Sequence, residues 1–190
     1  MSCRCPWLAP RSIWPGLFLL PFTLPSLADS GINDKTLSQS FELRAVIVPG
    51  CLLGAGSSDA TSFGSISFGQ VSTLSSNLDV VSTPGSGSIV LQCSPGTPFT
   101  LSLNAGNNAS GVGSGRFLAK GSEKLRYQLY QDAGYSVVWG NGSNGGANIS
   151  TTFPSSGNSL TYPVYARLFS VSPMPSAGFY VDTVTVTLSY

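Results

Sequence analysis

The chain has 190 residues, 42% of them hydrophobic and 11% aromatic, which is enough for one domain with a sizeable core but crowded for two. Charged residues are only 9%, and nine lysines and arginines nearly balance eight aspartates and glutamates, which argues against a nucleic-acid partner or an anionic membrane surface. Histidine is absent, so the usual base of serine and cysteine hydrolases is missing.

The first 28 residues are predicted to be a signal peptide that is cleaved after Ala28. Arg4 and Arg11 precede the apolar run IWPGLFLLPFTL, and Ser26-Leu27-Ala28 supplies small residues at the two positions that a signal peptidase reads. The run is short and interrupted by two prolines, so it is not expected to span a bilayer. We therefore expect an exported chain with no direct membrane insertion.

Cleavage also removes Cys3 and Cys5, so that Cys51 and Cys93 remain. A single pair in an exported chain predicts one disulfide, worth roughly 4 kcal/mol for a loop of about 40 residues in the chain-entropy model. A metal site is the alternative. It lacks ligands, because the chain has no histidine and no CxxC pair is left.

The chain after residue 28 is predicted to form an all-β domain. Almost every apolar stretch alternates with a period of two, and no window has a helical period with caps. The stretch SFELRAVIV, residues 40–48, is expected to be a strand with one apolar face before Pro49-Gly50 turns the chain. That face consists of Phe41, Leu43, Ala45 and Ile47. The next extended stretch, TSFGSISFGQV, is broken by glycines.

Two further strands are expected at SGSIVLQC, residues 86–93, and FTLSLNA, residues 99–105, each with an alternating apolar face. The turn sequence Ser94-Pro95-Gly96 lies between them, and a hairpin is the simplest connection. A loop rich in glycine, asparagine and serine follows at 104–115.

The rest of the chain predicts more short strands, at RFLAKG, KLRYQLYQD, YSVVWG, ANISTTF and LTYPVYARLF, and then a terminal strand that runs to the last residue. In KLRYQLYQD one face carries Leu125, Tyr127 and Leu129. In the terminal strand one face carries Val184, Val186, Leu188 and Tyr190, and the other carries Thr183, Thr185 and Thr187. Short strands separated by turn signals are typical of a β-sandwich.

Two patterns that could carry chemistry are interpreted as structural. Gly140, Gly142 and Gly145 in GNGSNG match the glycine spacing of a dinucleotide site, but the following residues predict strand and loop instead of the helix that holds a pyrophosphate. Four acidic residues could in principle form a glycosidase pair, although isolated carboxylates on a β surface more often are solvated or cap turns. These are Asp79, Glu123, Asp132 and Asp182.

The aromatic residues leave two alternatives. Trp139, together with Tyr130 and Tyr135, could stack on sugars, but aromatic side chains in strands are more often part of the core, which we favour. No catalytic residue, cofactor or metal site is expected, and the chain is not expected to be an enzyme.

The chain resembles the spore coat protein U family, the domain used by archaic, Csu-type chaperone–usher pilins of Gram-negative bacteria. The resemblance covers essentially all of the chain after the signal peptide, and the order and spacing of its motifs are more specific than any one of them. The motifs are PGC at Cys51, FGSISFG from Phe63, GSIVLQCSPGTPFTLSLNAG from Gly87, LRYQLYQDAGYSVVWGNG from Leu125, and PSAGFYVDTVTVTLSY at the end.

This resemblance implies a six-stranded, incomplete immunoglobulin-like β-sandwich that lacks its final strand and is completed by a donor strand. A periplasmic pilus chaperone would fill the groove first, and at the outer-membrane usher the amino-terminal segment of the next subunit would replace it. The physical reason is general: a strand with no neighbour exposes a ladder edge and an apolar groove, which needs a partner strand or aggregates.

The resemblance also assigns segments. Residues 29–40 are expected to be the donor segment, with the donor strand at about Ile32 to Phe41 and with Leu37 and Phe41 as the residues that fill the groove. A flexible tail is the alternative for this polar stretch. Residues 41–190 are expected to be the pilin domain. The acceptor groove is expected at Val184, Val186, Leu188 and Tyr190.

The expected function is therefore a structural subunit that passes through the periplasm and polymerises with neighbouring subunits into a cell-surface pilus, supporting adhesion and biofilm formation. The alternative is a self-complete secreted binding module, such as a lectin-like or coat protein.

Overall fold

The computed structural model describes residues 37–54 and 56–190. The predicted signal peptide and most of the predicted donor segment, including Ile32, lie outside these residues. The chain divides into two units, Met1–Arg44 and Ala45–Tyr190, and the fold described below is that of the second. Nowhere in the described ranges is there a helix of the length and apolarity needed to cross a membrane.

The described residues form ten strands and no helix, which confirms the all-β prediction. The strands are β1 (Cys51–Leu53), β2 (Leu78–Val81), β3 (Ile89–Cys93), β4 (Pro98–Leu103), β5 (Arg116–Lys120), β6 (Glu123–Tyr130), β7 (Ile149–Thr152), β8 (Leu160–Tyr162), β9 (Tyr165–Leu168) and β10 (Val186–Ser189).

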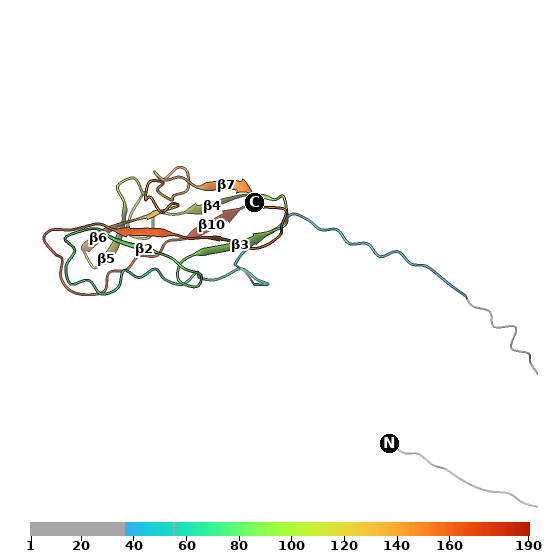
Figure 1. The fold of residues 1–190 in the computed structure, drawn as a ribbon, viewed down its shortest axis with the longest axis horizontal. Coiled ribbons are helices and arrows are strands. Elements are labelled where there is room, and N and C mark those ends of the chain that lie inside the picture. The colour runs from blue at the N-terminus through green and yellow to red at the C-terminus, as the bar shows by residue number, and fades with distance from the viewer. Residues whose placement is uncertain (1–36, 55) are drawn as a thin grey trace, which may run out of the picture. The chain divides into compact units, whose positions relative to one another are not determined.

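The strands pair antiparallel in three sheets, with the orders β1-β3-β8, β10-β4-β7 and β2-β9-β6-β5. In Figure 1 the β10-β4-β7 sheet lies above β2 and β3. The prediction of one strand at LTYPVYARLF is wrong, because it is split at Pro163 into β8 and β9, which belong to different sheets. Proline has no N–H to give to a ladder, so it ends the pairing there.

The core lies between the sheets and is made by alternate residues of four strands. Its strand residues are Ile89, Leu91 and Cys93 of β3, Phe99, Leu101 and Leu103 of β4, Tyr127 and Leu129 of β6, and Ala166 and Leu168 of β9. The period of two in the sequence is therefore the period of burial in β3, β4 and β9 and in the first half of β6, whereas the last four residues of β6 are all buried.

The predicted hairpin between β3 and β4 is wrong, because the two strands belong to different sheets. The chain turns a corner at Ser94, whose carbonyl accepts a hydrogen bond from the N–H of Thr97 (3.1 Å), and Gly96 donates to the carbonyl of Phe153 (3.0 Å). Both strands bury alternate residues in the same core, so the pattern of either one fits a hairpin and a corner equally well.

The strand predicted at residues 40–48 is absent from the described structure, and all of these residues are exposed. Phe41 is 82% exposed and Ile47 is 89% exposed. Alternating apolar residues form a strand only when a neighbouring strand satisfies their backbone groups, and none lies beside them among residues 37–54 and 56–190. The stretches TSFGSISFGQV and YSVVWG also contain no assigned strand.

The predicted disulfide is confirmed between Cys51 and Cys93, which face each other directly in the register of β1 and β3. It closes a loop with a sequence separation of 42 residues.

Strands β5 and β6 form a hairpin with a two-residue loop. Gly121 in this loop has a φ of 60°, and a positive φ here matches the twist of the two strands.

Candidate functional site

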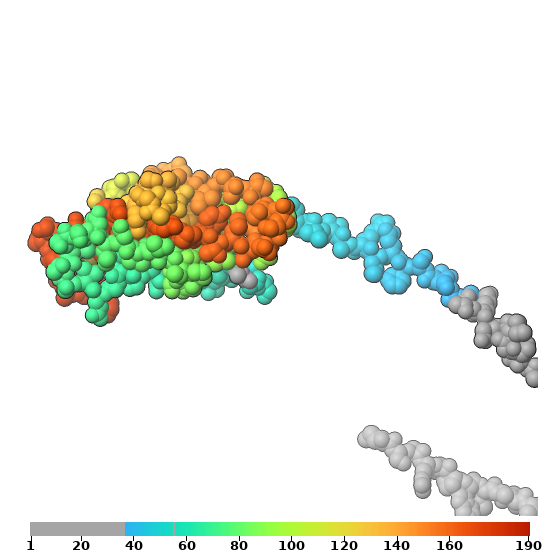
Figure 2. All heavy atoms as spheres, viewed as in Figure 1, coloured from blue at the N-terminus to red at the C-terminus, as the bar shows by residue number. Residues whose placement is uncertain are grey.

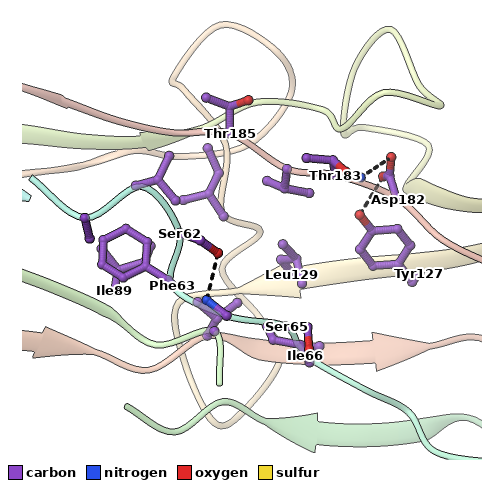
Figure 3. A pocket seen from close by; sticks show the side chains of 18 of the residues that line it. Ser62, Phe63, Ser65, Ile66, Ile89, Tyr127, Leu129, Asp182, Thr183 and Thr185 are labelled. Carbon is purple, nitrogen blue, oxygen red and sulfur yellow. Dashed lines mark hydrogen bonds between the residues drawn. The ribbon is translucent and has the colours of Figure 1, made fainter. Parts of the chain in front are cut away.

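A groove of about 610 Å³ lies along the core, between two segments that are far apart in the sequence. We call residues 60–68 the loop wall and residues 182–186 the C-terminal wall. Figure 3 shows Asp182, Thr183 and Thr185 along one side of this groove, with Phe63, Ser65 and Ile66 across from them. Its apolar floor includes Leu53, Ile89, Leu103, Leu118, Leu129, Val164 and Ala166.

The loop wall is attached to the domain by side chains more than by its backbone. Phe63, Ile66 and Phe68 are half-buried against the core, and the teal and green atoms of this region lie on the body of the domain in Figure 2. Within the described residues, segment 61–70 makes one backbone hydrogen bond to the rest of the domain, from the N–H of Gly87 to the carbonyl of Phe63 (2.7 Å). Most of its backbone groups therefore remain free to pair.

Gly64 explains how the loop wall fits so closely. Its φ is +86°, and a Cβ at this position would lie 2.1 Å from the carbonyl oxygen of Gly85. Only glycine tolerates both the backbone conformation and the close approach. Gly64, which appeared in the sequence as a strand breaker, thus allows the loop wall to pack against the turn before β3.

The C-terminal wall crosses from one sheet to another. At its start Val181 exchanges two backbone hydrogen bonds with Ala119 of β5 (2.9 and 3.1 Å), and at its end β10 pairs with β4. In between, the N–H and carbonyl of Val184 have no hydrogen-bond partner among the described residues. The wall therefore presents an unpaired strand edge to the groove.

Asp182 fixes the point where the C-terminal wall begins. Its carboxylate accepts hydrogen bonds from the hydroxyl of Tyr127 (2.7 Å), the N–H of Asn107 (2.9 Å), the side-chain amide of Asn108 (3.0 Å) and the N–H of Thr183 (2.9 Å). Burial, and then the neighbouring carboxylate, raise the pKa of Tyr127, so its hydroxyl stays protonated and keeps donating.

A buried arginine supports the other end of this wall. Arg116 is fully buried and donates to the carbonyls of Asn104 (2.7 and 3.1 Å) and Trp139 (2.7 Å) and to the amide oxygen of Gln128 (2.7 Å). Burial lowers the pKa of Arg116 to about 10, which still leaves it charged at neutral pH. Asn104 in turn exchanges hydrogen bonds with Thr185 of the wall (2.8 and 3.1 Å).

The residues predicted for the acceptor groove occupy different places. Val184 and Val186 line the groove, whereas Leu188 is half-buried opposite Leu101 of β4. Tyr190 is 66% exposed and lies beyond the end of β10. The loop wall was not predicted from the sequence, although the apolar residues Phe63, Ile66 and Phe68 between glycines were a visible signal.

Three of the four acidic residues considered for catalysis lie outside the groove and are bonded to other parts of the domain: Asp79, Glu123 and Asp132. Asp79 forms a bidentate ion pair with Arg167 (2.7 Å for both contacts). Asp132 accepts hydrogen bonds from the N–H groups of Ser136 and Val137, which lowers its pKa. Asp79 thus pairs β2 with β9 through its ion pair, and Asp132 caps the turn after β6.

Glu123, at the start of β6, fastens the loop that leads to the C-terminal wall. It accepts hydrogen bonds from the hydroxyl and the N–H of Ser176, from the hydroxyl of Tyr180 (2.9 Å) and from Lys120 (3.4 Å). The bonds from Ser176, followed by that from Tyr180, lower the pKa of Glu123 to about 2. With Asp182 in the groove, all four acidic residues thus hold backbone or side chains in place.

The aromatic residues and the glycine motif have structural places. Trp139 is fully buried and Tyr130 is buried, as the core interpretation predicted for them. Tyr135 is half-buried, with the guanidinium of Arg167 4.1 Å from the centre of its ring. The GNGSNG stretch forms a loop without a helix, in which Gly140 and Ala147 are hydrogen-bonded (2.8 Å).

Comparisons with known proteins identify one family. The family model described as the Spore Coat Protein U domain matches residues 37–187. No curated protein matches the chain. The CsuC–CsuE chaperone–tip adhesion subunit pre-assembly complex of the archaic chaperone–usher Csu pili of Acinetobacter baumannii is similar at 27% identity, with a TM-score of 0.45, and covers 76% of this chain.

A second solved structure, a chaperone–tip adhesin complex in the biogenesis of CFA/I fimbriae, is similar at 19% identity with a TM-score of 0.40, and covers 65% of this chain. The match spans 40% of the chain from the Csu complex and 38% of the chain from the CFA/I complex.

Proposed function

Because the chain belongs to the Spore Coat Protein U domain family, a family of structural, non-enzymatic proteins, we propose that it is a structural subunit of an archaic chaperone–usher pilus. In this proposal the subunit polymerises by donor-strand exchange. An extended segment of another molecule enters the groove between the loop wall and the C-terminal wall and completes the sandwich.

The observation that carries the proposal is the groove between a loop wall with a largely unpaired backbone and a C-terminal wall in which the N–H and carbonyl of Val184 are unpaired among the described residues. An incoming strand could pair with Val184 on one side and with the loop wall on the other. The apolar floor would receive every second side chain of that strand. A self-complete sandwich would be expected to close such a groove with its own strand, because exposed strand edges and apolar surface promote aggregation.

The chain also carries a segment that could act as the donor. Residues 37–48 contain no strand and are exposed, yet they are rich in apolar residues. Leu37, Phe41, Leu43 and Ile47 are separated by even numbers of residues, so in an extended strand they project from one face. The proposed donor therefore retains Leu37 and Phe41 and continues to Ile47.

Ile32 is less well placed for the same face. It stands five positions before Leu37, and an odd separation puts two side chains on opposite faces of an uninterrupted strand. Leu43 and Ile47 replace it in the proposed donor.

The remaining partners follow from the same proposal. A groove that is open in the monomer needs protection before assembly, which a periplasmic pilus chaperone would provide, and an outer-membrane usher would then exchange the chaperone for the next subunit. The product would be a cell-surface pilus that supports adhesion and biofilm formation. The proposal includes export by the predicted signal peptide.

The proposal can be tested with the exported chain, residues 29–190, and with a variant that lacks residues 29–47. Both are purified and assayed for multimers by size-exclusion chromatography and by gel electrophoresis without heating. We expect multimers of the exported chain alone. The shortened variant should stay monomeric and should bind a synthetic peptide of residues 29–48, with binding measured by fluorescence anisotropy.

A matched control uses a peptide of the same length in which Phe41 and Leu43 are replaced by serine. This peptide should bind at least about tenfold more weakly, since two apolar side chains no longer enter the groove. A shortened variant that is stable but binds neither peptide would contradict the proposal, and would favour a self-complete binding module.

A further inference from the structure

The disulfide connects the two ends of the segment that contains the loop wall. Cys51 is the first residue of β1 and Cys93 is the last residue of β3, and the loop wall at 60–68 lies between them in the sequence. Immediately after Cys93 the chain turns into β4, which begins at Pro98. β4 pairs with β10, the strand that continues the C-terminal wall.

Two covalent routes therefore lead from residue 50 to β4. The long route follows the main chain through β1, the loop wall, β2 and β3. The short route crosses the disulfide from Cys51 to Cys93 and enters β4 after one turn. Because a covalent bond does not stretch appreciably under forces that break hydrogen bonds, tension applied at residue 50 follows the short route.

The long route would fail easily if it carried tension. β1 has only three residues, paired with β3. Leu53 of β1 is bonded to the start of the loop wall, where its carbonyl accepts from the N–H of Ala60 (2.6 Å). Beyond this bond, the loop wall has one backbone hydrogen bond to the rest of the domain, at Phe63. Peeling β1 from β3 would therefore pull directly on a weakly held wall of the groove.

We propose that the Cys51–Cys93 disulfide is a mechanical bypass, which carries tension from the N-terminal segment straight to β3 and β4 and keeps the loop wall unloaded. The inference rests on the proposed function, because tension arises only if the N-terminal segment is held by one subunit while the groove holds the strand of another. Under load, the disulfide thus preserves the groove in addition to stabilising the fold.

A constant-force experiment on single molecules tests this inference. The exported chain carries a DNA handle at residue 29, and the peptide of residues 29–48, fixed to a bead, occupies its groove. The lifetime of the bound peptide is compared between the protein with the disulfide and the Cys51→Ser/Cys93→Ser variant. We expect the lifetime under load to fall at least about tenfold without the disulfide, with less than about a threefold change at zero load.

A second handle position separates the bypass from ordinary stabilisation. Gln92 has an exposed side chain on β3, so a handle on an azide-bearing amino acid at this position delivers the load beyond the disulfide. Here the presence of the disulfide should change the lifetime by less than about twofold. If the double variant does not fold, reduction of the assembled complex on the bead provides the same comparison.

Each outcome is decisive. Equal lifetimes under load at the residue 29 handle, or an equal loss at both handle positions, would overturn the bypass while leaving the proposed function intact. Failure of the peptide to bind the disulfide-bonded protein at zero load would instead overturn the proposed function and the bypass together.

Discussion

The C-terminal wall is bonded to β5 through Val181 and to β4 through β10, and two polar networks around Asp182 and Arg116 hold its ends. The loop wall makes two backbone hydrogen bonds to the rest of the domain, at Ala60 and Phe63, and otherwise rests on three half-buried apolar side chains. One groove therefore has a fixed wall and a loosely held wall. If the groove accepts a strand as proposed, the fixed wall would set the register of that strand while the loosely held wall adapts to it.

Removing the carboxylate of the fixed wall should have the largest effect. Asp182→Ala leaves the part-buried hydroxyl of Tyr127 and the amide of Asn108 without their acceptor, so we expect the free energy of unfolding to fall by about 3 kcal/mol. Urea denaturation followed by tryptophan fluorescence measures this change.

The control for that substitution is Thr187→Ala, an exposed position on β10 of the same segment. It should change the unfolding free energy by less than about 0.5 kcal/mol. If the two substitutions have the same effect, Asp182 does not hold the wall and the comparison between the walls fails.

Displacing the loosely held wall should cost less and act locally. Gly64→Ala places a Cβ against the carbonyl of Gly85, so we expect the loop wall to detach at a cost of about 2 kcal/mol, which combines lost apolar contacts with backbone strain. Detachment exposes Phe63 and Phe68, and limited chymotrypsin digestion should cut there while the C-terminal wall stays intact.

Gly69→Ala is a matched control, because Gly69 also has a positive φ, of 75°, but a Cβ there would meet nothing within 4 Å. Gly69→Ala should lower the free energy of unfolding by about 1 kcal/mol through backbone strain, without new chymotrypsin cleavage at Phe63. Equal cleavage in both variants would mean that the approach to Gly85 does not hold the wall.

Lowering the pH should have the smallest effect on the fixed wall, through the loop that Glu123 fastens. The pKa of Glu123 is lowered to about 2 from 4.5, so its charged form is favoured by the folded loop. The stabilisation is fully present above about pH 4.5 and is lost as the pH falls toward 2. We expect the exchange protection of the Ser176 N–H to decline across this window, as measured by hydrogen–deuterium exchange.

The variant Glu123→Gln isolates this titration, because it keeps an acceptor but has no charge to lose. Its Ser176 protection should be lower at neutral pH and should not change between pH 4.5 and 2 beyond the common pH dependence of exchange. A decline in this variant equal to that of the natural chain would assign the pH effect to other groups.

Much of the fold could be predicted from the residues alone, because burial and sequence period coincide in its central strands. The alternation in KLRYQLYQD predicted which face of β6 packs on the core. The two cysteines that remain after the predicted signal-peptide cleavage predicted the disulfide. The connection of β3 to β4 was mispredicted as a hairpin, because the inward face of a strand is the same in a hairpin and at a corner.

The site was predicted only in part for a related reason. The alternation of Val184 and Val186 indicated one wall, whereas the other wall has no regular strand and depends on contacts made by Phe63 and Gly64 with distant residues. The apolar face of residues 41–47 was assigned to a strand of the domain, yet in the structure those residues are exposed.

The sequence by itself determined the all-β class, the family, the single disulfide and the side of each central strand that faces the core, since these depend on residue type and spacing. The tertiary structure decided which strands are neighbours, which edges stay unpaired and where the groove lies. Those properties depend on hydrogen bonds and contacts between segments that are far apart in the chain. The periodicity within one segment does not specify which other segment lies beside it.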